Sequence, residues 1–309
     1  MFFMKEDAIL LSLRDAAVLY RTEKSERLVW SRISMDIHAG EWIAVTGANG
    51  SGKSTLASVL LGVRALSRGS LVRSGACIVR GVLQSPDSQF VGETIGDELE
   101  GAAAARADAG ADSDAGVSVG VGADIGAGEM SEPEFNRFGR EALAAVGLAL
   151  PLERSLSSLS GGQKQLVNLA VALASKPDVL VLDEPGAMLD PDARQRILNI
   201  VQEAHHGGMT VIWITHRMEE ACRADRVIAF LDGMVSFDGT PRAFFYGSHD
   251  QLGPGQPSGM PDQIPCQELK MELPYVVRIA IGLLERGHRL EPLPLHADEL
   301  VEAVGAGCR

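Results

Sequence analysis

Apolar and polar residues alternate along the first part of the chain, and continuous apolar runs follow later. Ile33, Met35 and Ile37 alternate with polar residues, which is the period-two pattern of a half-buried strand. Residues 8–46 are therefore expected to form β-structure. Continuous apolar runs are typical of strands that are buried on both faces of a parallel sheet. Such runs span residues 42–46, 179–182 and 210–215.

Helical spacing of apolar residues predicts helices between and after these strands. The predicted helices cover residues 56–63, residues 134–146, the segment from Leu166, the segment from Pro191, and two short C-terminal pieces at 276–284 and 299–304. Asp232-Gly233 separates two further apolar runs and predicts a tight hairpin turn. Alternating strands and helices of this kind predict an α/β fold.

Two stretches depart from this pattern. Residues 101–132 are dominated by Ala and Gly with scattered Asp, and they carry too little apolar surface to offset the entropy of ordering. We expect a low-complexity, disordered insertion there, although its Ala-rich start at 102–107 can extend a helix. Residues 247–265 are rich in Gly and Pro and predict a linker.

Composition narrows the possible functions. The chain has 309 residues and a formal charge of −13, which argues against a nucleic-acid partner because phosphate backbones are bound by clustered Lys and Arg. Its four cysteines are far apart, so we expect reduced thiols, with a disulfide framework or zinc site as a remote alternative. No run approaches the ~20 apolar residues that span a bilayer. We expect a soluble chain that reaches a membrane only through partner subunits.

The stretch Gly47–Thr55 is a complete phosphate-binding loop between a predicted strand and a predicted helix. Its glycines let backbone N–H groups surround a phosphate, and the helix N-terminus adds partial positive charge. Lys53 is expected to reach the β- and γ-phosphates, and the Ser54 hydroxyl to bind Mg²⁺. The alternative, a chance Gly-rich turn, lacks this strand–loop–helix context. The chain is therefore expected to bind a nucleoside triphosphate.

Two residues on either side of this loop, Tyr20 and Gln84, are ambiguous when each is taken alone. Gln84 follows the predicted strand 77–83, where an amide can reach Mg²⁺ or an attacking water, although this signal is weak. Tyr20 ends an apolar run before a charged loop. It is either a platform on which adenine stacks or an ordinary strand tyrosine.

A second anion-binding device is predicted at Leu159–Gln163, where Ser and two glycines precede a helix. The simpler alternative is an N-cap. Further along, the strand 179–182 delivers Asp183 and Glu184 at its carboxyl end, where ligands bind in open α/β sheets. Asp183 is expected to hold the Mg²⁺ shell and Glu184 to act as general base, while a capping or salt-bridge role is the alternative.

Asp190 is expected to cap the helix that Pro191 opens. His216 ends the strand 210–215, from which it can sense or hold the γ-phosphate. His205-His206 is expected at a solvated helix end rather than in a metal site.

In combination these motifs resemble those of the ATP-binding-cassette (ABC) ATPases. The matching pieces, in the family order, are Gly47–Thr55 (Walker A), Gln84 (Q-loop), Leu159–Gln163 (signature), Val179–Glu184 (Walker B), Ala187–Asp190 (D-loop) and His216 (switch histidine). The resemblance covers most of residues 8–245 and implies a P-loop NTPase fold with a RecA-like mixed sheet, an N-terminal antiparallel β subdomain and an α-helical subdomain. It also favours the adenine-stacking role of Tyr20.

The implied organisation has three parts: the cassette at 8–246, with a helical subdomain at about 90–175; a linker at 247–267; and a small helical dimerisation or packing segment at 268–309. The implied cofactors are ATP and Mg²⁺. Catalytic roles fall to Glu184, His216 and Gln84, and metal ligation to Ser54, Gln84 and Asp183. The implied nucleotide contacts are Tyr20, Gly47, Asn49, Gly50, Ser51, Gly52, Lys53, Ser54, Thr55, Ser160, Gly161, Gly162, Gln163 and Asp190.

A narrower resemblance concerns the segment Gln84–Thr94, which is similar to the extended Q-loop of energy-coupling-factor (ECF) transporter ATPases, in particular the first of their two ATP-binding subunits. Residues 188–191 and the tail fit the same group. That family powers uptake of vitamins and transition-metal ions. The resemblance implies a second ABC ATPase (a paralogue or a second copy), a transmembrane scaffold, indirect contact with a substrate-binding membrane subunit, and a peripheral location on the cytoplasmic face of the cell membrane.

The sequence departs from the family pattern at Leu166, usually Arg, at Gly186, usually a hydroxyl residue, and at Arg217, usually Asp. These changes bear on turnover and partner fit more than on nucleotide binding. The alternatives to an ECF subunit are an ATPase of another ABC transporter class, a soluble ABC ATPase acting on ribosomes or DNA, and a regulatory nucleotide sensor.

Overall fold

A computed structural model describes residues 8–22, 25–108, 130–187, 189–247 and 264–307. The chain divides into two compact units. The first contains the residues up to Glu41 together with Ser54–Ile214, and the second contains Trp42–Lys53 together with the residues from Thr215 onward. The chain therefore passes between the units before Trp42, within the phosphate-binding loop after Lys53, and after the strand 210–214.

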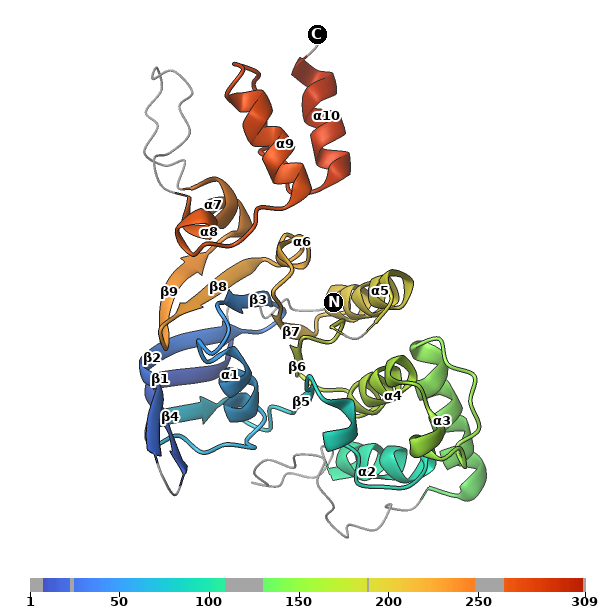
Figure 1. The fold of residues 1–309 in the computed structure, drawn as a ribbon. Helices are drawn as coiled ribbons and strands as arrows, with labels where there is room; N and C mark the ends of the chain where they lie inside the picture. Colours follow the sequence, from blue (N-terminus) through green and yellow to red (C-terminus); the bar gives the residue numbers. More distant parts are fainter. Residues whose placement is uncertain (1–7, 23–24, 109–129, 188, 248–263, 308–309) are drawn as a thin grey trace. The chain divides into compact units, whose positions relative to one another are not determined.

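An antiparallel sheet forms the N-terminal part of the first unit (Figure 1). Its strands are β1 (Ile9–Thr22), β2 (Ser25–His38) and β4 (Arg68–Arg73), in the order β2-β1-β4. Ile33, Met35 and Ile37 are at most 5% exposed, while the polar residues between them are partly or fully exposed. The alternation in the sequence thus identified the buried face of β2 correctly, because successive side chains of a strand point to opposite faces.

A parallel set of strands carries the functional residues of the first unit. It consists of β5 (Val79–Val82), β6 (Val179–Asp183) and β7 (Thr210–Ile214), in the order β5-β6-β7. Every residue of β6 and β7 is buried, as their continuous apolar runs predict. The register pairs Val82 with Leu182 and Asp183 with Ile214. Because the strands are parallel and in register, Gln84 and Glu184 leave the sheet at the same edge.

Helices complete the first unit. They are α1 (Lys53–Leu60, whose first residue belongs to the second unit), α2 (Ile95–Asp108), α3 (Glu132–Ala145), α4 (Gly161–Ala174) and α5 (Pro191–His206), with the short 3₁₀ turns η1 (Pro86–Ser88) and η2 (Leu156–Ser158). α2, α3 and α4 pack against one another in the expected helical region (Figure 1). α5 ends at His206, so His205-His206 lies at a helix end as expected.

The expected insertion at 101–132 is only partly described. Residues 101–108 continue α2, as the Ala-rich start of this stretch allows. The side chains of Ala102, Ala103 and Ala104 are at most 7% exposed, because alanine is small enough to pack closely against neighbouring helices and favours the helix. Residues 109–129 lie outside the described residues, and so does most of the expected linker, at 248–263.

The second unit contains β3 (Trp42–Gly47), β8 (Arg226–Leu231) and β9 (Met234–Gly239). β3 pairs with β8 in parallel, and β8 with β9 in antiparallel orientation. Asp232 and Gly233 have φ angles of 47° and 75°, which are the positive values of a type I′ turn. The hairpin predicted at this dipeptide is confirmed.

The remaining helices of the second unit are α6 (Met218–Ala221), α7 (Pro241–Tyr246), α8 (Pro265–Glu268), α9 (Tyr275–Leu284) and α10 (Ala297–Gly307). α9 and α10 lie side by side (Figure 1). Arg242 of α7 contacts α10 and the segment before it. Its guanidinium donates to the Glu299 carboxylate of α10 at 2.8 Å and to the Leu293 carbonyl at 2.9 Å. Within the described ranges, no helix is long and apolar enough to cross a membrane.

Candidate functional site

The phosphate-binding loop belongs to the second unit and requires its glycines. Gly47, Gly50 and Gly52 have φ angles of 145°, 77° and 106°, which side chains other than hydrogen disfavour. A Cβ on Gly47 would lie 2.3 Å from the Phe230 carbonyl oxygen. Only glycine can occupy position 47, because the loop backbone passes so close to the Phe230 carbonyl. This close contact and the positive φ angles explain why the motif contains glycines.

The polar side chains of Ser51 and Lys53 are buried inside the loop. The Lys53 ammonium donates to the carbonyl oxygens of Gly47 and Ala48 at 2.9 and 3.0 Å, and its side chain is buried. The hydroxyl of Ser51 is buried and has no hydrogen-bond partner among the described residues. An unpaired buried hydroxyl is costly, and a phosphate oxygen is a suitable partner for it. Asn49 lies exposed at the loop tip.

The helix α1 carries Ser54 and Thr55 into the first unit. Ser54 is exposed and Thr55 is buried. The Thr55 hydroxyl lies 3.3 Å from the hydroxyl of Tyr20, the expected adenine platform. The ring of Tyr20 is covered on one face by the guanidinium of Arg64, 3.8 Å from the ring centroid. The structure thus joins Tyr20 to α1, and Arg64 is a residue that the sequence motifs do not indicate.

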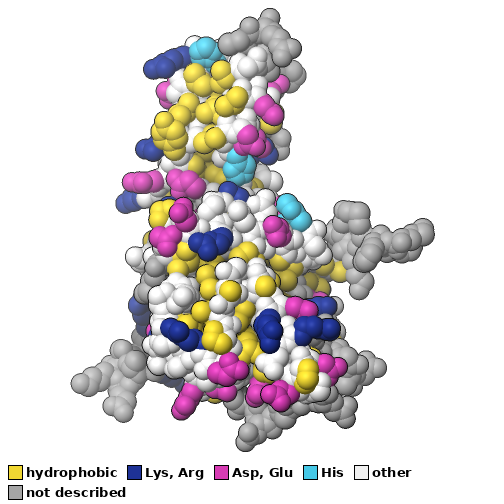
Figure 2. Space-filling model, turned by 90° about the vertical axis from the view of Figure 1, so that its right-hand side faces the viewer, with side chains coloured by type: hydrophobic (Ala, Val, Ile, Leu, Met, Phe, Trp, Pro, Cys, Tyr) yellow, Lys and Arg dark blue, Asp and Glu magenta, His cyan; other side chains and the backbone are white. Residues whose placement is uncertain are grey.

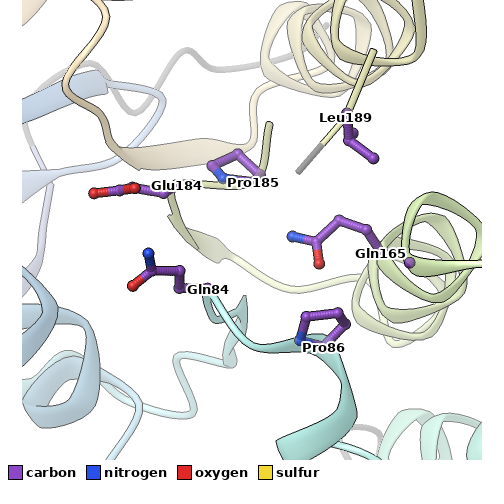
Figure 3. A pocket seen from close by; sticks show the side chains of 7 residues that line it. Gln84, Pro86, Gln165, Glu184, Pro185 and Leu189 are labelled. Atoms are coloured by element: carbon purple, nitrogen blue, oxygen red, sulfur yellow. The ribbon is translucent and has the colours of Figure 1, made fainter. Parts of the chain in front are cut away.

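A small pocket collects residues from four motifs of the first unit at the carboxyl edge of its parallel strands. Its lining residues are Gln84, Pro86, Gly161, Gln165, Glu184, Pro185 and Leu189. In Figure 3 the Gln84 amide and the Glu184 carboxylate lie at the same end of this pocket. Residues separated by a hundred positions in sequence therefore meet here, as the register of β5 and β6 requires. The edge between these strands brings the expected Q-loop and Walker B side chains together.

The backbone just before Gln84 is held by Gln89, a residue that the sequence motifs do not indicate. Gln89 accepts a hydrogen bond from the Leu83 N–H at 2.7 Å and donates one to the Gly81 carbonyl at 3.1 Å. These two bonds attach the Gln89 side chain to the backbone at the end of β5. The only sequence signal for this role is a side-chain amide, with one donor and one acceptor end, placed shortly after a strand.

Contacts also join the Gln84 loop to the signature helix α4. Lys164 forms an ion pair with Asp87, and the Asn168 amide donates to the Pro86 carbonyl at 3.1 Å. Since Asn168 is buried, the second bond is shielded from water. An ion pair and a hydrogen bond therefore link the loop after Gln84 directly to α4, whose first turn contains Gly161–Gln163.

Asp183 and Glu184 differ in their surroundings. Asp183 is 3% exposed, whereas Glu184 is half-buried. Glu184 has a φ of 50°, a left-handed conformation that costs a non-glycine residue about 1–3 kcal/mol. Its N–H donates to the Ile214 carbonyl at 3.0 Å, which helps to hold this conformation. The strained turn directs the Glu184 side chain to the pocket end that it shares with Gln84.

The signature segment forms the N-cap that was the simpler alternative. The Ser160 hydroxyl accepts from the Gln163 N–H at 3.3 Å, and the Gln163 side chain accepts from the Ser160 N–H at 3.1 Å. This reciprocal pair is a capping box. A Cβ on Gly161 would meet nothing within 4 Å, so the helix start is open to an approaching group. Anion binding at Ser160–Gln163 stays a prediction.

Asp190 caps α5, as predicted, because its carboxylate accepts from the Ala193 N–H at 2.9 Å. His216 lies exposed in the second unit at the end of the segment that follows β7. Behind it, the Thr215 hydroxyl donates to the buried Glu220 carboxylate at 2.6 Å. The Arg217 guanidinium lies 3.5 Å from the same carboxylate, so this departure from the family pattern supplies a counter-charge for Glu220.

The other two departures are also packed into the structure. Leu166 is 5% exposed in α4. Gly186 provides room for Arg194, since a Cβ on this glycine would lie 2.8 Å from the Arg194 Cγ. Arg194 donates to the carbonyls of Gly186 at 3.2 Å and Leu189 at 2.9 Å. The lack of a side chain at Gly186 thus leaves room for Arg194, which donates hydrogen bonds to the backbone around the D-loop. Met188 of this loop lies outside the described residues.

Cys77, Cys222 and Cys266 are free thiols. Cys308 lies outside the described part of the chain. Burial raises the pKa of Cys77 to about 11 and the pKa of both Cys222 and Cys266 to about 12. All three are neutral at physiological pH. A protonated thiol is a weaker nucleophile than a thiolate.

Known proteins share both the motifs and the fold. Residues 30–187 match the ABC transporter family. The energy-coupling factor transporter ATP-binding protein EcfA1 of Symbiobacterium thermophilum is 36% identical over 297 residues, which cover 90% of this chain and 88% of that protein. The protein of the same name from Halalkalibacterium halodurans is 32% identical over 300 residues, which cover 93% and 95%.

Solved structures agree. The structure of cbiO1 from Clostridium perfringens, part of the ABC transporter complex cbiONQ, has a TM-score of 0.58 and 25% identity over 78% of this chain and 91% of that chain. A dimeric, post-hydrolysis structure of the ATP-binding cassette MJ0796 bound to ADP and Pi has a TM-score of 0.63 and 21% identity over 76% of this chain and 100% of that chain. The latter likeness shows the fold.

The fold and the ordered motifs define an ATP-binding cassette. The chain belongs to the ABC transporter family, among the ATP-binding proteins of energy-coupling factor transporters. The expected fold class, the expected ATPase class and the expected function as an ATP-binding subunit of such a transporter are confirmed.

Proposed function

We propose that this chain binds ATP with Mg²⁺ and hydrolyses it to drive an importer of the energy-coupling-factor type. The observation that carries the proposal is the phosphate-binding loop, with three glycines at positive φ, a buried Lys53 and a buried Ser51 hydroxyl that lacks a partner among the described residues. These groups fit the negative charge and the oxygen acceptors of a triphosphate. Tyr20 is the proposed adenine platform.

The metal ligands that we propose are oxygen atoms, as Mg²⁺ prefers. Ser54 presents an exposed hydroxyl at the start of α1. Gln84 and Asp183 come from the carboxyl edge of neighbouring strands. When bound, Mg²⁺ neutralises charge that develops on the phosphate oxygens.

Glu184 is the proposed general base. A half-buried carboxylate, directed by a strained backbone turn, is suited to accept a proton from a water that attacks the γ-phosphate in line. The Gln84 amide at the same pocket end orients this water or the metal. His216 is the proposed γ-phosphate contact from the second unit.

The proposed catalytic unit is a pair of cassettes, formed with a paralogue or a second copy. The segment Ser160–Gln163 of one subunit then covers the γ-phosphate held by the other, and Asp190 contributes from the D-loop. An open helix start at Gly161 supports this assignment. ATP would join the two subunits, and hydrolysis would add charge repulsion that separates them.

The residues 268–309 are the proposed packing or dimerisation segment. Figure 2 shows hydrophobic side chains gathered at the upper end of one face, where Figure 1 places α9 and α10. Tyr275 and Val301 are 65% and 72% exposed. Exposed apolar surface of this kind is typical of a protein interface.

The proposed partners also include a transmembrane scaffold and, through it, a substrate-binding membrane subunit, with this chain on the cytoplasmic face of the membrane. The EcfA1 relatives are named as ATP-binding proteins of a transporter, and cbiO1 is described as part of a transporter complex. Vitamins or transition-metal ions are the proposed cargo, which this chain does not contact. No nucleic acid is involved, consistent with the charge of −13.

The test is the substitution Glu184→Gln, which keeps the size of the side chain but removes its basicity. We expect ATP hydrolysis to fall by about a hundredfold or more, in keeping with loss of a general base, and ATP-bound dimers to accumulate in gel filtration. Glu203→Gln, on the exposed end of α5, is the matched control and should retain parental activity. Parental hydrolysis by Glu184→Gln would remove Glu184 from the role of base.

A second experiment tests the transport role. The tagged chain is purified from membranes in mild detergent, and stoichiometric partners are identified. Recovery with a second ABC ATPase and a multi-span membrane protein is expected. Recovery alone or with ribosomes would contradict the importer and favour a soluble ABC ATPase.

A further inference from the structure

The ring of Tyr20 is already stacked on one face. The Arg64 guanidinium carbon lies 3.8 Å from the ring centroid, within the range of a cation–π contact. Both side chains are half-buried. Tyr20 comes from β1 and Arg64 from the segment after α1, so the contact joins two elements of the first unit.

Backbone contacts hold Arg64 in this place. Gly62, with φ of 72°, ends the first helical run, and the Arg64 N–H returns to the Ser58 carbonyl at 3.0 Å. Three residues later, Ser67 is bonded to β1 on both sides of Val18. Its N–H donates to the Ala17 carbonyl at 2.8 Å, and its hydroxyl accepts from the Leu19 N–H at 2.9 Å. The chain around Arg64 is therefore fixed next to Tyr20 at both ends.

The hydroxyl end of the ring is fixed as well. It lies 3.3 Å from the Thr55 hydroxyl near the N-terminus of α1, the end of the helix at which phosphates bind. Arg64 reaches the ring from the segment beyond the C-terminus of the same helix. Thr55 and Arg64 thus contact Tyr20 from opposite ends of α1.

We propose that Arg64 is a positioning residue for ATP: it backs the Tyr20 ring, and the adenine base stacks on the opposite face. This inference rests on the proposed function, because it deepens the nucleotide site. A ring held by a cation on one face loses less freedom when a base stacks on the other, and such preorganisation improves affinity. Arg64 contributes through the ring and makes no contact with the phosphates.

The experiment measures the dissociation constant of the full-length chain for the β,γ-imido analogue of ATP with Mg²⁺, by titration calorimetry. Arg64→Ala is expected to weaken binding about three- to tenfold, the range of an exposed to partly desolvated cation–π contact. Arg64→Gln, which keeps most of the side-chain length, is expected to weaken it similarly. The control is Arg68→Ala, an exposed arginine of the same region, which should leave affinity unchanged.

Two further measurements separate the ring from simple charge. Inorganic tripolyphosphate, which has no base, should bind the parent and Arg64→Ala equally. In a Tyr20→Leu background, Arg64→Ala should cause no further loss. Unchanged or tighter binding of the ATP analogue by Arg64→Ala would overturn the inference, and so would an equal loss for tripolyphosphate or full additivity with Tyr20→Leu. If the parent binds neither ligand, the proposed function itself fails.

Discussion

Replacement of Gly186 tests whether its small size is matched to Arg194. The φ angle of Gly186 is outside the left-handed region, so the backbone accepts alanine. The added Cβ, however, would lie 2.8 Å from Arg194 Cγ and 3.1 Å from its Nε. The obstructing atoms belong to the middle of the side chain, so Arg194 must leave its place.

The displacement has a calculable cost. Arg194 would lose its hydrogen bonds to the carbonyls of Gly186 and Leu189, each worth about 1 kcal/mol for a partly buried pair. Gly186→Ala should therefore lower the free energy of unfolding by about 1–2 kcal/mol, despite the gain of about 0.4–1 kcal/mol that a Gly→Ala change brings through the unfolded chain. Gly186→Thr, which restores a hydroxyl residue, should cost at least as much.

The assay is urea denaturation of the parent, Gly186→Ala, Arg194→Ala and the double variant. Once Arg194 is shortened, the clash is absent, and Gly186→Ala should become neutral or stabilising. The two substitutions should therefore be coupled by about 2 kcal/mol, the contribution of the two hydrogen bonds that the clash breaks. If Gly186→Ala costs the same in both backgrounds, or stabilises the parent, the proposed match between Gly186 and Arg194 is wrong.

Two more predictions concern Gln89 and the thiols. Gln89→Leu removes both hydrogen bonds that hold the backbone at the end of β5. The kcat for ATP hydrolysis should therefore fall severalfold, while affinity for the ATP analogue is retained. The control is Gln195→Leu on the exposed face of α5, and an affinity loss without a change in kcat would contradict the positioning role. Burial raises the pKa of Cys222 and Cys266 to about 12, above the value of about 8.5 in the unfolded chain. The unfolded state then releases protons first, so the free energy of unfolding should fall as pH rises above about 8.5, by about 1 kcal/mol per thiol at pH 9.5. Urea titrations at pH 7.5 and 9.5 should show this loss in the parent and a smaller one in Cys222→Ala/Cys266→Ala, whereas equal losses would refute it.

Much of the candidate site could be predicted from local sequence. Phosphate binding by Gly47–Thr55 depends on glycine conformations within one loop, and the observed φ angles agree. The strands that end at Asp183 and Ile214 were evident from continuous apolar runs, because burial on both faces leaves no polar position. The hairpin at Asp232-Gly233 follows from the same kind of local rule.

Residues that act across the fold could not be predicted in this way. Arg64 and Tyr20 are 44 positions apart by their numbers and meet only because Ser67 bonds to β1. Gln89 and Arg194 act on carbonyl groups, which every residue possesses, so their partners leave no mark in the sequence. The capping box at Ser160 and Gln163 shows the converse case, because a pair three residues apart at a helix start is predictable from the local sequence.

The sequence by itself determined the order of the motifs, the glycine loop, the buried strands and the acidic balance, since each of these depends on neighbouring residues or on composition. The tertiary structure decided which side chains support the motifs: Arg64 behind Tyr20, Gln89 on the backbone of Gly81 and Leu83, Arg194 at Gly186 and Arg217 with Glu220. Such pairs arise from strand register and helix packing, which bring residues together that are far apart in the sequence. The number of residues between them does not indicate their distance in space.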